Sequence, residues 1–406
     1  MRAEPRHATF NGQLSGNVHA RRSTGIDHWM LGAVQRSVAE APIRFELWDG
    51  TSAGPSRERS VATLVIKTRH TLLSWLWDPE LNFGEAYMRG AVEIRGDLRD
   101  LLTAIYRALP ESTRRQGRRV ERHDLRRSRD NVHAHYDLGN DFYRLWLDEQ
   151  LLYTCAYFPD ADATLEAAQV AKMDRVCRKL WLKPGDRVVD AGCGWGSLAL
   201  HMARNYGVTV LACNLSSEQI AYARDRAARE DLAGRVTFVE DDYRNLTGTF
   251  DAFASVGMLE HVGLDQYETL AAVIDRTLTP DGRGLLHFIG RDRPEPLNAW
   301  IRRRVFPGAY PPTLYEVCKH VFEPARLSVF DVENLRPHYA LTLQHWRDRF
   351  ERHAEQISRV FDDSFVRAWR LYLAGSQVAF ETGSMQLLQV VFTRRGSTNV
   401  PWTRLQ

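Results

Sequence analysis

Three glycines at alternate positions, Gly192, Gly194 and Gly196, follow closely after Asp190 and an apolar run. A backbone without Cβ atoms can approach a ligand closely and can adopt dihedral angles that other residues avoid. The apolar run predicts a buried strand, and residues 197–203 predict a helix whose free N–H groups face the turn. The stretch therefore predicts a ligand site at a strand–turn–helix unit.

A glycine turn also occurs in dinucleotide-binding folds and in ordinary α/β turns, so the next elements decide between ligands. Further strands are expected at residues 208–212, 236–239 and 250–255, which together form a doubly wound sheet. The chain has no G-x-x-x-x-G-K-[ST] motif, which argues against a nucleoside triphosphate. NAD needs an acidic residue after the second strand, where this chain has Asn214. Asp190 and the acids at 240–242 instead resemble the layout of class I S-adenosylmethionine methyltransferases.

Two residues with acid–base chemistry come later. Glu260 follows the fourth predicted strand, and His287 lies inside the apolar run 285–289. Glu260 could be a loop acid, but in methyltransferases this position faces the cofactor, which favours a functional role. A histidine in an apolar strand is more often a core residue, and Cys155 is more often a small buried apolar side chain than a nucleophile.

Composition limits the class of protein. A chain of 406 residues with 44% hydrophobic residues suits two domains. The chain has no run of eighteen apolar residues, so no membrane span is expected. It also has no continuous apolar signal region near its start, so secretion is not expected. Five cysteines without regular spacing indicate a reducing cytoplasm and no metal site.

The chain divides into four predicted parts. Residues 1–36 are expected to be a flexible lead segment, and 37–112 a small α+β domain with no catalytic constellation. Residues 113–130 form an arginine-rich linker, and 131–406 a catalytic domain. The linker is either a solvated face or a surface for anionic lipid head groups; it lacks the interleaved aromatic residues expected of a nucleic-acid site.

Five motifs together resemble the cyclopropane-fatty-acyl-phospholipid synthases and the related mycolic acid cyclopropane synthases. They are His135-Tyr136-Asp137-Leu138-Gly139-Asn140-Asp141-Phe142-Tyr143, Tyr153-Thr154-Cys155-Ala156-Tyr157-Phe158, Gly192-Cys193-Gly194-Trp195-Gly196, Glu260-His261-Val262-Gly263 and Leu285-Leu286-His287-Phe288-Ile289-Gly290. The resemblance covers most of the chain from about Ile43. The small N-terminal domain is similar to that of the bacterial phospholipid enzymes, which favours phospholipid acyl chains as the substrate.

The resemblance implies a reaction and two small-molecule participants. The acyl double bond attacks the methyl carbon of S-adenosylmethionine, and the resulting carbocation loses a proton to a bound bicarbonate ion and closes to a cyclopropane. The catalytic positions that match the family are Cys155, Glu260, His287, Ile289 and Tyr339, with Cys155 and Ile289 acting through main-chain groups. Glu260 and His287 would hold the bicarbonate, and Tyr339 would donate a hydroxyl.

The cofactor-binding residues expected from the motifs are Tyr153, Thr154, Asp190, Gly192, Gly194, Gly196, Asn214, Leu215, Gln219, Asp242 and Tyr243. Asn214 departs from the general class I pattern, which has an acid at the ribose. Residues 300–308, with three arginines among apolar residues, are interpreted as a lip that touches head groups, against the alternative of a surface loop.

Other functions remain open. The same scaffold could add a methyl or methylene branch without closing a ring, the arginine linker could serve an RNA methyltransferase, and a lipid-binding protein could have lost catalysis. We expect a cytoplasmic homodimer on the inner face of the membrane that contacts anionic lipid, takes its substrate from the bilayer and binds no nucleic acid.

Overall fold

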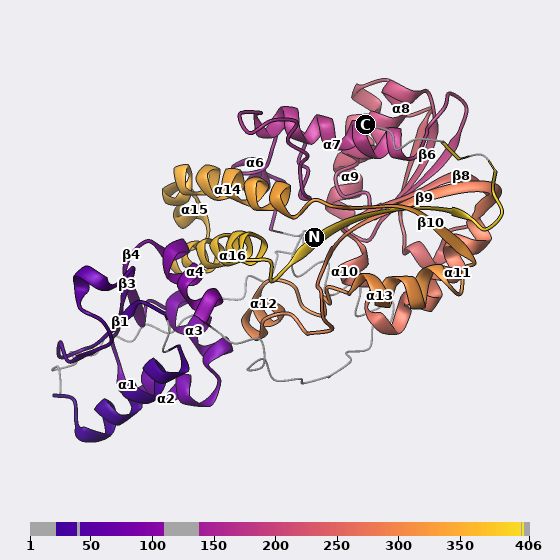
Figure 1. The fold of residues 1–406 in the computed structure, drawn as a ribbon. Coiled ribbons are helices and arrows are strands. Elements are labelled where there is room, and N and C mark those ends of the chain that lie inside the picture. Colours follow the sequence, from indigo (N-terminus) through magenta and orange to yellow (C-terminus); the bar gives the residue numbers. More distant parts are fainter. Residues whose placement is uncertain (1–21, 39–40, 109–137, 399, 402–406) are drawn as a thin grey trace, which may run out of the picture.

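Two separate sheets organise the chain (Figure 1). The structure, a computed structural model, describes residues 22–38, 41–108, 138–398 and 400–401. A four-stranded sheet of order β2-β1-β3-β4 lies in the N-terminal part, and a seven-stranded sheet of order β10-β11-β9-β8-β5-β6-β7 lies in the rest. The predicted arginine linker, 113–130, is outside the described residues.

The N-terminal sheet has mixed directions. Its strands are β1 (Ile43–Leu47), β2 (Ser52–Ala53), β3 (Ala62–Ile66) and β4 (Val92–Gly96). β1 pairs in parallel with β3, whereas the β1–β2 and β3–β4 pairs are antiparallel. The helices of this part are α1 (Gly25–Ser37), α2 (Arg69–Trp77), α3 (Pro79–Met88) and α4 (Leu98–Ala108). The alternating burial of β1 follows from its period-two pattern and places one face against the helices.

Helix α1 corrects the prediction of a flexible lead segment for residues 25–36, whereas residues 1–21 of the predicted segment are outside the described residues. Thr24 and Asp27 form a capping box at its start, and Met30, Leu31 and Val34 are buried in the small core. The fully buried Asp27 carboxylate also pairs with Arg69 of α2, which lowers the pKa of Asp27. Polar residues between the few apolar ones hid the helical period in the sequence.

The seven-stranded sheet confirms the predicted doubly wound α/β fold. Its strands are β5 (Arg187–Ala191), β6 (Thr209–Asn214), β7 (Val236–Glu240), β8 (Phe250–Val256), β9 (Leu278–Gly290), β10 (Leu327–Asn334) and β11 (Gln386–Arg394). β5 to β9 run parallel, β11 pairs antiparallel with β9, and β10 pairs antiparallel with β11. The chain leaves the central pair β5–β8 in opposite directions, which opens a crevice at the carboxyl ends of these strands. β10 was not predicted from the sequence, because half of its residues are polar and none of them is buried.

Helices cover both faces of this sheet. One face packs against α7 (Leu165–Lys179), α8 (Ser197–Tyr206) and α9 (Ser217–Arg229), and the other against α10 (Leu259–Val262), α11 (Tyr267–Thr277) and α13 (Leu314–Val317). Because both faces are covered, the middle strands are continuous apolar runs. A third core, beside the sheet, joins α6 (Asn140–Arg144), α14 (Arg336–Arg352), α15 (Ala354–Val360) and α16 (Asp363–Glu381).

The two parts of the molecule meet where α3 and α4 pack on α16 and on α12 (Ala299–Arg304). Arg304 of α12 donates to both carboxylate oxygens of Glu85, at 2.6 and 2.8 Å. Trp300 is buried, and an added Cβ on Gly84 would lie 2.4 Å from its ring. The region 300–308 was interpreted as a lip for lipid head groups; Trp300 and Arg304 instead join the two parts.

Within the residues that the structure describes, no helix has the length and apolar character needed to cross a membrane.

Candidate active site

A cavity of about 140 Å³ opens at the carboxyl ends of the parallel strands, where the doubly wound topology predicts a ligand. Ten of the eleven predicted cofactor residues line it: Tyr153, Thr154, Asp190, Gly192, Gly194, Asn214, Leu215, Gln219, Asp242 and Tyr243. They come from the segment before α7 and from the ends of β5, β6 and β7. The fold therefore gathers residues that are as much as 90 positions apart in the sequence, from 153 to 243, at one cavity.

The two later glycines of the turn have different tasks. Gly194 lines the cavity at a φ of +54°, and an added Cβ would point into open space. Gly196 is absent from the lining and caps α8 at a φ of +82°; its added Cβ would lie 2.6 Å from Phe238. The assignment of Gly196 as a cofactor contact is therefore corrected to a packing role, in which α8 approaches β7 and α9.

The side chains at the β6 and β7 ends hold one another in place. The side-chain Nδ2 of Asn214 donates to the side-chain Oε1 of Gln219 at 2.5 Å. The side-chain Oδ1 of Asn214 accepts a hydrogen bond from the Leu215 N–H at 2.9 Å. Both oxygens of Asp242 accept hydrogen bonds from Arg244, at 2.7 and 2.9 Å. This end of the cavity thus offers oriented polar groups with little net charge, which suits a neutral nucleoside.

Two buried ionisable groups also line the cavity. Burial raises the pKa of Asp190 to about 7, and its Oδ2 atom has no hydrogen-bond partner among the described residues. Lys172 of α7 is 1% exposed and donates to the Thr154 hydroxyl at 2.8 Å. The sequence analysis missed Lys172; the signal was a lysine among the apolar residues on the inward face of the predicted helix. Arg244 was missed as well, and only its position beside Asp242 could have indicated it.

A second group of predicted residues lies behind the cavity wall. Glu260 of α10 is 7% exposed, and its Oε1 atom accepts the Ile289 N–H at 2.5 Å. Burial raises the pKa of Glu260 to about 7, and its Oε2 atom has no partner in the described part of the chain. The carboxyl is therefore close to half-protonated at neutral pH, which suits a group that exchanges protons.

His287 lies on β9, two residues before Ile289 and thus on the same face of the strand. Its Nδ1 atom is 3.0 Å from the Gln389 amide nitrogen, and burial lowers the pKa of His287 to about 3. The ring is therefore neutral; with Nδ1 accepting from Gln389, Nε2 carries the proton. Nε2 is buried and has no acceptor among the described residues, so it is a donor available to a small ligand.

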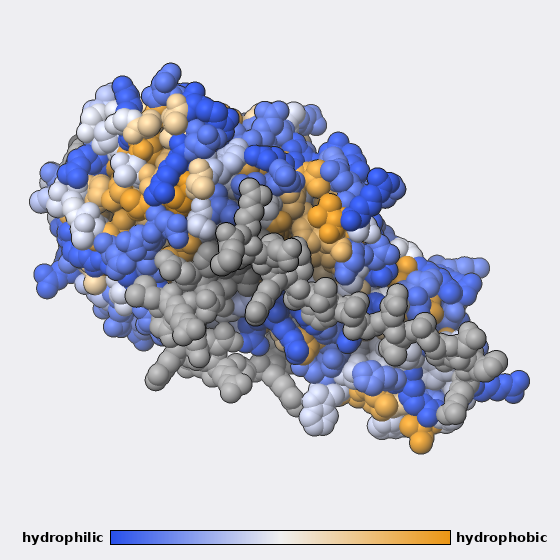
Figure 2. Space-filling view, turned by 180° about the vertical axis from the view of Figure 1, so that it is seen from behind, coloured by the Kyte–Doolittle hydropathy of each residue, from blue (hydrophilic) through white to orange (hydrophobic). Residues whose placement is uncertain are grey.

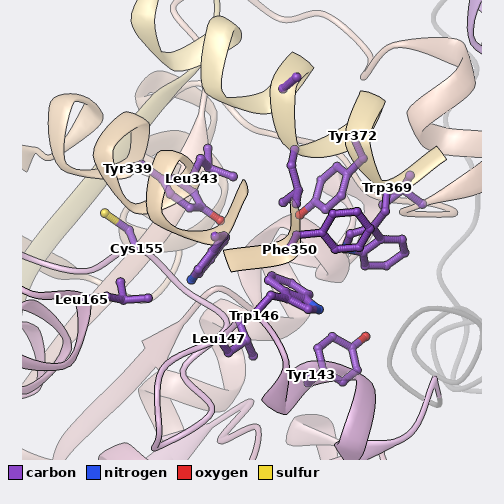
Figure 3. Packing of buried hydrophobic residues seen from close by; sticks show 14 of the residues in the cluster. Tyr143, Trp146, Leu147, Cys155, Leu165, Tyr339, Leu343, Phe350, Trp369 and Tyr372 are labelled. Carbon is purple, nitrogen blue, oxygen red and sulfur yellow. The ribbon is translucent and has the colours of Figure 1, made fainter. Parts of the chain in front are cut away.

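Cys155 and Tyr339 belong to the aromatic core (Figure 3). Ile289 packs against this core. The Cys155 thiol lies 3.1 Å from the Ala156 carbonyl oxygen, and burial raises its pKa, so it is a poor nucleophile. Tyr339 is 7% exposed and packs edge-on against Trp346. Glu260 and Ile289 are therefore joined by a direct hydrogen bond within this predicted set.

The cavity-lining residues and the predicted catalytic residues are close together in the sequence. Thr154, on the cavity wall, directly precedes Cys155, and the wall residues Met258 and His261 flank Glu260. The structure thus contains a larger cavity with polar ends and, behind its wall, a buried carboxyl and imidazole with unused hydrogen-bonding atoms.

Comparisons with known proteins agree with this architecture. The mycolic acid cyclopropane synthetase family model matches residues 123–390, and a domain of unknown function matches 31–116. A cyclopropane synthase structure from Mycobacterium tuberculosis superposes with a TM-score of 0.63 and 31% identity over 66% of this chain and 98% of that one. A mycolic acid cyclopropane synthase solved with SAH and CTAB has a TM-score of 0.62 and 30% identity over 66% of this chain and 98% of that one.

Two curated relatives extend the comparison. A probable fatty acid methyltransferase of Pseudomonas putida is 37% identical over 89% of this chain and 95% of its own length. The cyclopropane-fatty-acyl-phospholipid synthase of Escherichia coli K12 is 42% identical over 64% of this chain and 66% of its own length.

The sheet, the glycine turn and the cavity define a class I S-adenosylmethionine-dependent methyltransferase. The chain belongs to the mycolic acid cyclopropane synthetase family. The predicted family, fold class and enzyme class are therefore confirmed, whereas the roles of the individual site residues stay predictions. The cavity fits the cofactor, since Gly194 leaves open space on its wall and Asp190 presents an unpartnered acceptor.

The cavity wall gives a first prediction. Gly194→Ala adds a methyl group in the space meant for the ligand, so S-adenosylmethionine affinity measured by calorimetry should fall at least about 10-fold. Gly185→Ala is the matched control, because Gly185 also has a positive φ and open space at its Cβ but lies outside the cavity lining. Equal affinities in the two variants would contradict the placement of the ligand.

The buried carboxyl of Glu260 gives a second prediction. Because burial raises its pKa to about 7 from an ordinary value of 4.5, the folded protein binds more protons than the unfolded chain between these values. The free energy of unfolding should therefore fall as pH rises from about 4.5 to 7, by about 3 kcal/mol from this group. Urea unfolding of Glu260→Gln should show a flatter profile in this window; an identical slope would refute the assignment.

Proposed function

We propose that the enzyme transfers a methylene carbon from S-adenosylmethionine to the cis double bond of unsaturated phospholipid acyl chains and forms a cyclopropane ring. The observation that carries the proposal is two buried side chains, Glu260 and His287, whose Oε2 and Nε2 atoms have no partner among the described residues. An imidazole N–H donor and a carboxyl that can be protonated near neutral pH suit a small oxyanion such as bicarbonate. S-adenosylmethionine supplies the electrophilic methyl carbon.

In the proposed reaction, His287, Glu260 and Ile289 have different roles near a cation on the acyl chain. Neutral His287 would hold and polarise a bicarbonate ion through Nε2–H, and that ion would supply the base for the proton released as the ring closes. Glu260, with a pKa of about 7, can take the proton onward at neutral pH. The main-chain N–H of Ile289 holds Glu260 in place, and the predicted contributions of Tyr339 and the Cys155 main chain complete the oxyanion site.

The aromatic core supports the same chemistry. Tyr153 lines the cofactor cavity, and its ring lies 5.2 Å from Trp146 and 5.3 Å from Trp346. Figure 3 shows Trp146, Tyr339 and Tyr372 converging on this region from different elements. Aromatic faces attract positive charge without forming a bond to it, and they exclude the water that would quench a carbocation.

A branching reaction is the second candidate, and the comparisons contain a specific observation in its favour. The relatives that match almost the whole chain are named fatty acid methyltransferases, including one from Mycobacterium tuberculosis named for tuberculostearic acid. A branched product arises from the same cation when a neighbouring chain carbon loses the proton, or when a hydride shift moves the cation before the methyl carbon loses its proton. The position of the proton acceptor relative to the cation therefore contributes to the choice between the two products.

Membrane contact belongs to the proposal as well. Large apolar side chains are exposed on the N-terminal part, with Trp29 at 65% on α1 and Trp77 at 88% on α2, and Figure 2 shows apolar patches among hydrophilic residues on the face that it presents. With the arginines of residues 113–130, these suit an anionic bilayer surface. A cytoplasmic homodimer on the inner membrane, which draws its phospholipid from the bilayer, completes the proposal.

A third prediction tests the reaction and the proton path together. Glu260→Gln keeps the shape but cannot exchange a proton, so kcat should fall about 100-fold or more while cofactor affinity stays within about threefold. Removing bicarbonate should slow the native enzyme, and adding it back should restore the rate. Glu230→Gln, which alters an ion-paired carboxyl on the far side of α9, is the control and should turn over normally.

Proton NMR of the lipid product distinguishes the two candidate reactions. Ring methylene signals at high field support cyclopropanation, and a methyl or exocyclic methylene signal supports branching. A ring product made at the native rate by Glu260→Gln would refute the proton path.

A fourth prediction concerns the membrane. Replacing Arg114, Arg115, Arg118 and Arg119 by glutamine should weaken binding to anionic vesicles, and binding of the native protein should weaken as salt rises. The control variant replaces four exposed arginines elsewhere, Arg178, Arg229, Arg352 and Arg359, and loses the same charge. Equal vesicle binding by the two variants would show that the linker has no special role.

A further inference from the structure

Lys172 lies on the inward face of α7 and has unusual surroundings for a lysine. The side chain is 1% exposed, and its one hydrogen bond in the structure goes to the Thr154 hydroxyl at 2.8 Å. Among the described residues no carboxylate oxygen lies within ion-pair distance of its ammonium group, whereas Lys179 on the same helix pairs with Asp331 and Glu333. A buried ammonium has three N–H donors, so two of them are left for a partner.

The nearby acids do not supply that partner. Asp148 accepts hydrogen bonds from the N–H groups of Gln150 and Leu152. Asp190 is not within ion-pair distance of Lys172 and acts on it by longer-range electrostatic attraction. Burial lowers the pKa of Lys172 to about 8, so the group still carries its charge at neutral pH. A buried charge without a counter-ion is unfavourable, and an anion entering from the cavity would relieve it.

The cavity shows where such an anion would lie. Lys172, Thr154 and Asp190 line the cavity that Asn214 and Asp242 also line. The ammonium group of Lys172 and the carboxyl of Asp190 are near each other but are not paired. Together they suit a zwitterionic ligand, whose carboxylate would face Lys172 and whose ammonium group would face Asp190. The amino-acid end of S-adenosylmethionine carries both a carboxylate and an ammonium group.

We infer that Lys172 binds the carboxylate of the cofactor's amino-acid end, while Asp190 accepts its ammonium group. Lys172 thereby fixes which end of the cavity the sulfonium methyl faces, and the Thr154 hydroxyl orients the lysine. The inference rests on the proposed use of S-adenosylmethionine and adds to it a residue that none of the sequence motifs contains.

The test compares ligands that differ at this end. Calorimetry without lipid measures binding of S-adenosylmethionine, of decarboxylated S-adenosylmethionine, which keeps the ammonium, and of 5′-methylthioadenosine, which lacks both groups. Lys172→Met should weaken binding of S-adenosylmethionine about 10- to 100-fold and leave the decarboxylated ligand within about threefold. Asp190→Asn should weaken both of these ligands and leave 5′-methylthioadenosine unchanged.

Lys179→Met is the matched control, because it removes a buried lysine from the same helix outside the cavity lining; it should change no ligand preference. A Lys172→Met protein that weakens all three ligands equally, or none, overturns the inference. The native protein provides a test that does not depend on a variant folding: it should prefer S-adenosylmethionine over the decarboxylated ligand at least about 10-fold. Absence of binding by all three ligands would refute the cofactor site itself, whereas binding without preference refutes only the role of Lys172.

Discussion

The site depends on the exclusion of water from a small set of ionisable side chains at the carboxyl edge of the sheet. Burial moves the pKa values of Asp190 and Glu260 up to about 7 and that of His287 down to about 3. The same groups in water would be two permanent anions and a histidine that is partly charged. Desolvation therefore leaves two carboxyls that can be neutral near pH 7 and a neutral imidazole at this edge of the sheet, which suits the proposed reaction.

That exclusion is produced by packing from several directions. The helices α14 and α16 bring Trp346, Tyr339 and Tyr372 over the cavity wall, and the Tyr372 hydroxyl hydrogen-bonds to that of Tyr153 at 2.6 Å. The opposite side of α16 meets the N-terminal part, where Arg367 donates to the Met88 carbonyl oxygen. Helix α16, which closes the aromatic core, thus also contacts the small domain.

The sequence predicted the central sheet and most of the cofactor cavity, because these depend on local signals. Glycines at a turn, an acid at a strand end and apolar runs of strand length can all be recognised in the sequence without a structure. Lys172 and Arg244 were missed because their importance comes from burial and from neighbours distant in sequence. Gly196 was over-interpreted, since a packing glycine and a ligand-facing glycine have the same sequence signature. Trp300 and Arg304 were misread because an ion pair across two domains leaves no local pattern.

The choice between a ring and a branch is harder to read for a physical reason. Both products share the electrophile, the cation and the need for a dry aromatic site, so all residues that serve those steps are common to both. The products differ in whether the cation migrates by a hydride shift and in which carbon loses its proton, so the choice depends on where an acceptor lies relative to the cation. Glu260 is held by the Ile289 N–H and His287 by Gln389, both from the adjoining strands β9 and β11. A rigid sheet can hold an acceptor more precisely than a loop can. In the proposed reaction, these strands would therefore contribute to the choice of product.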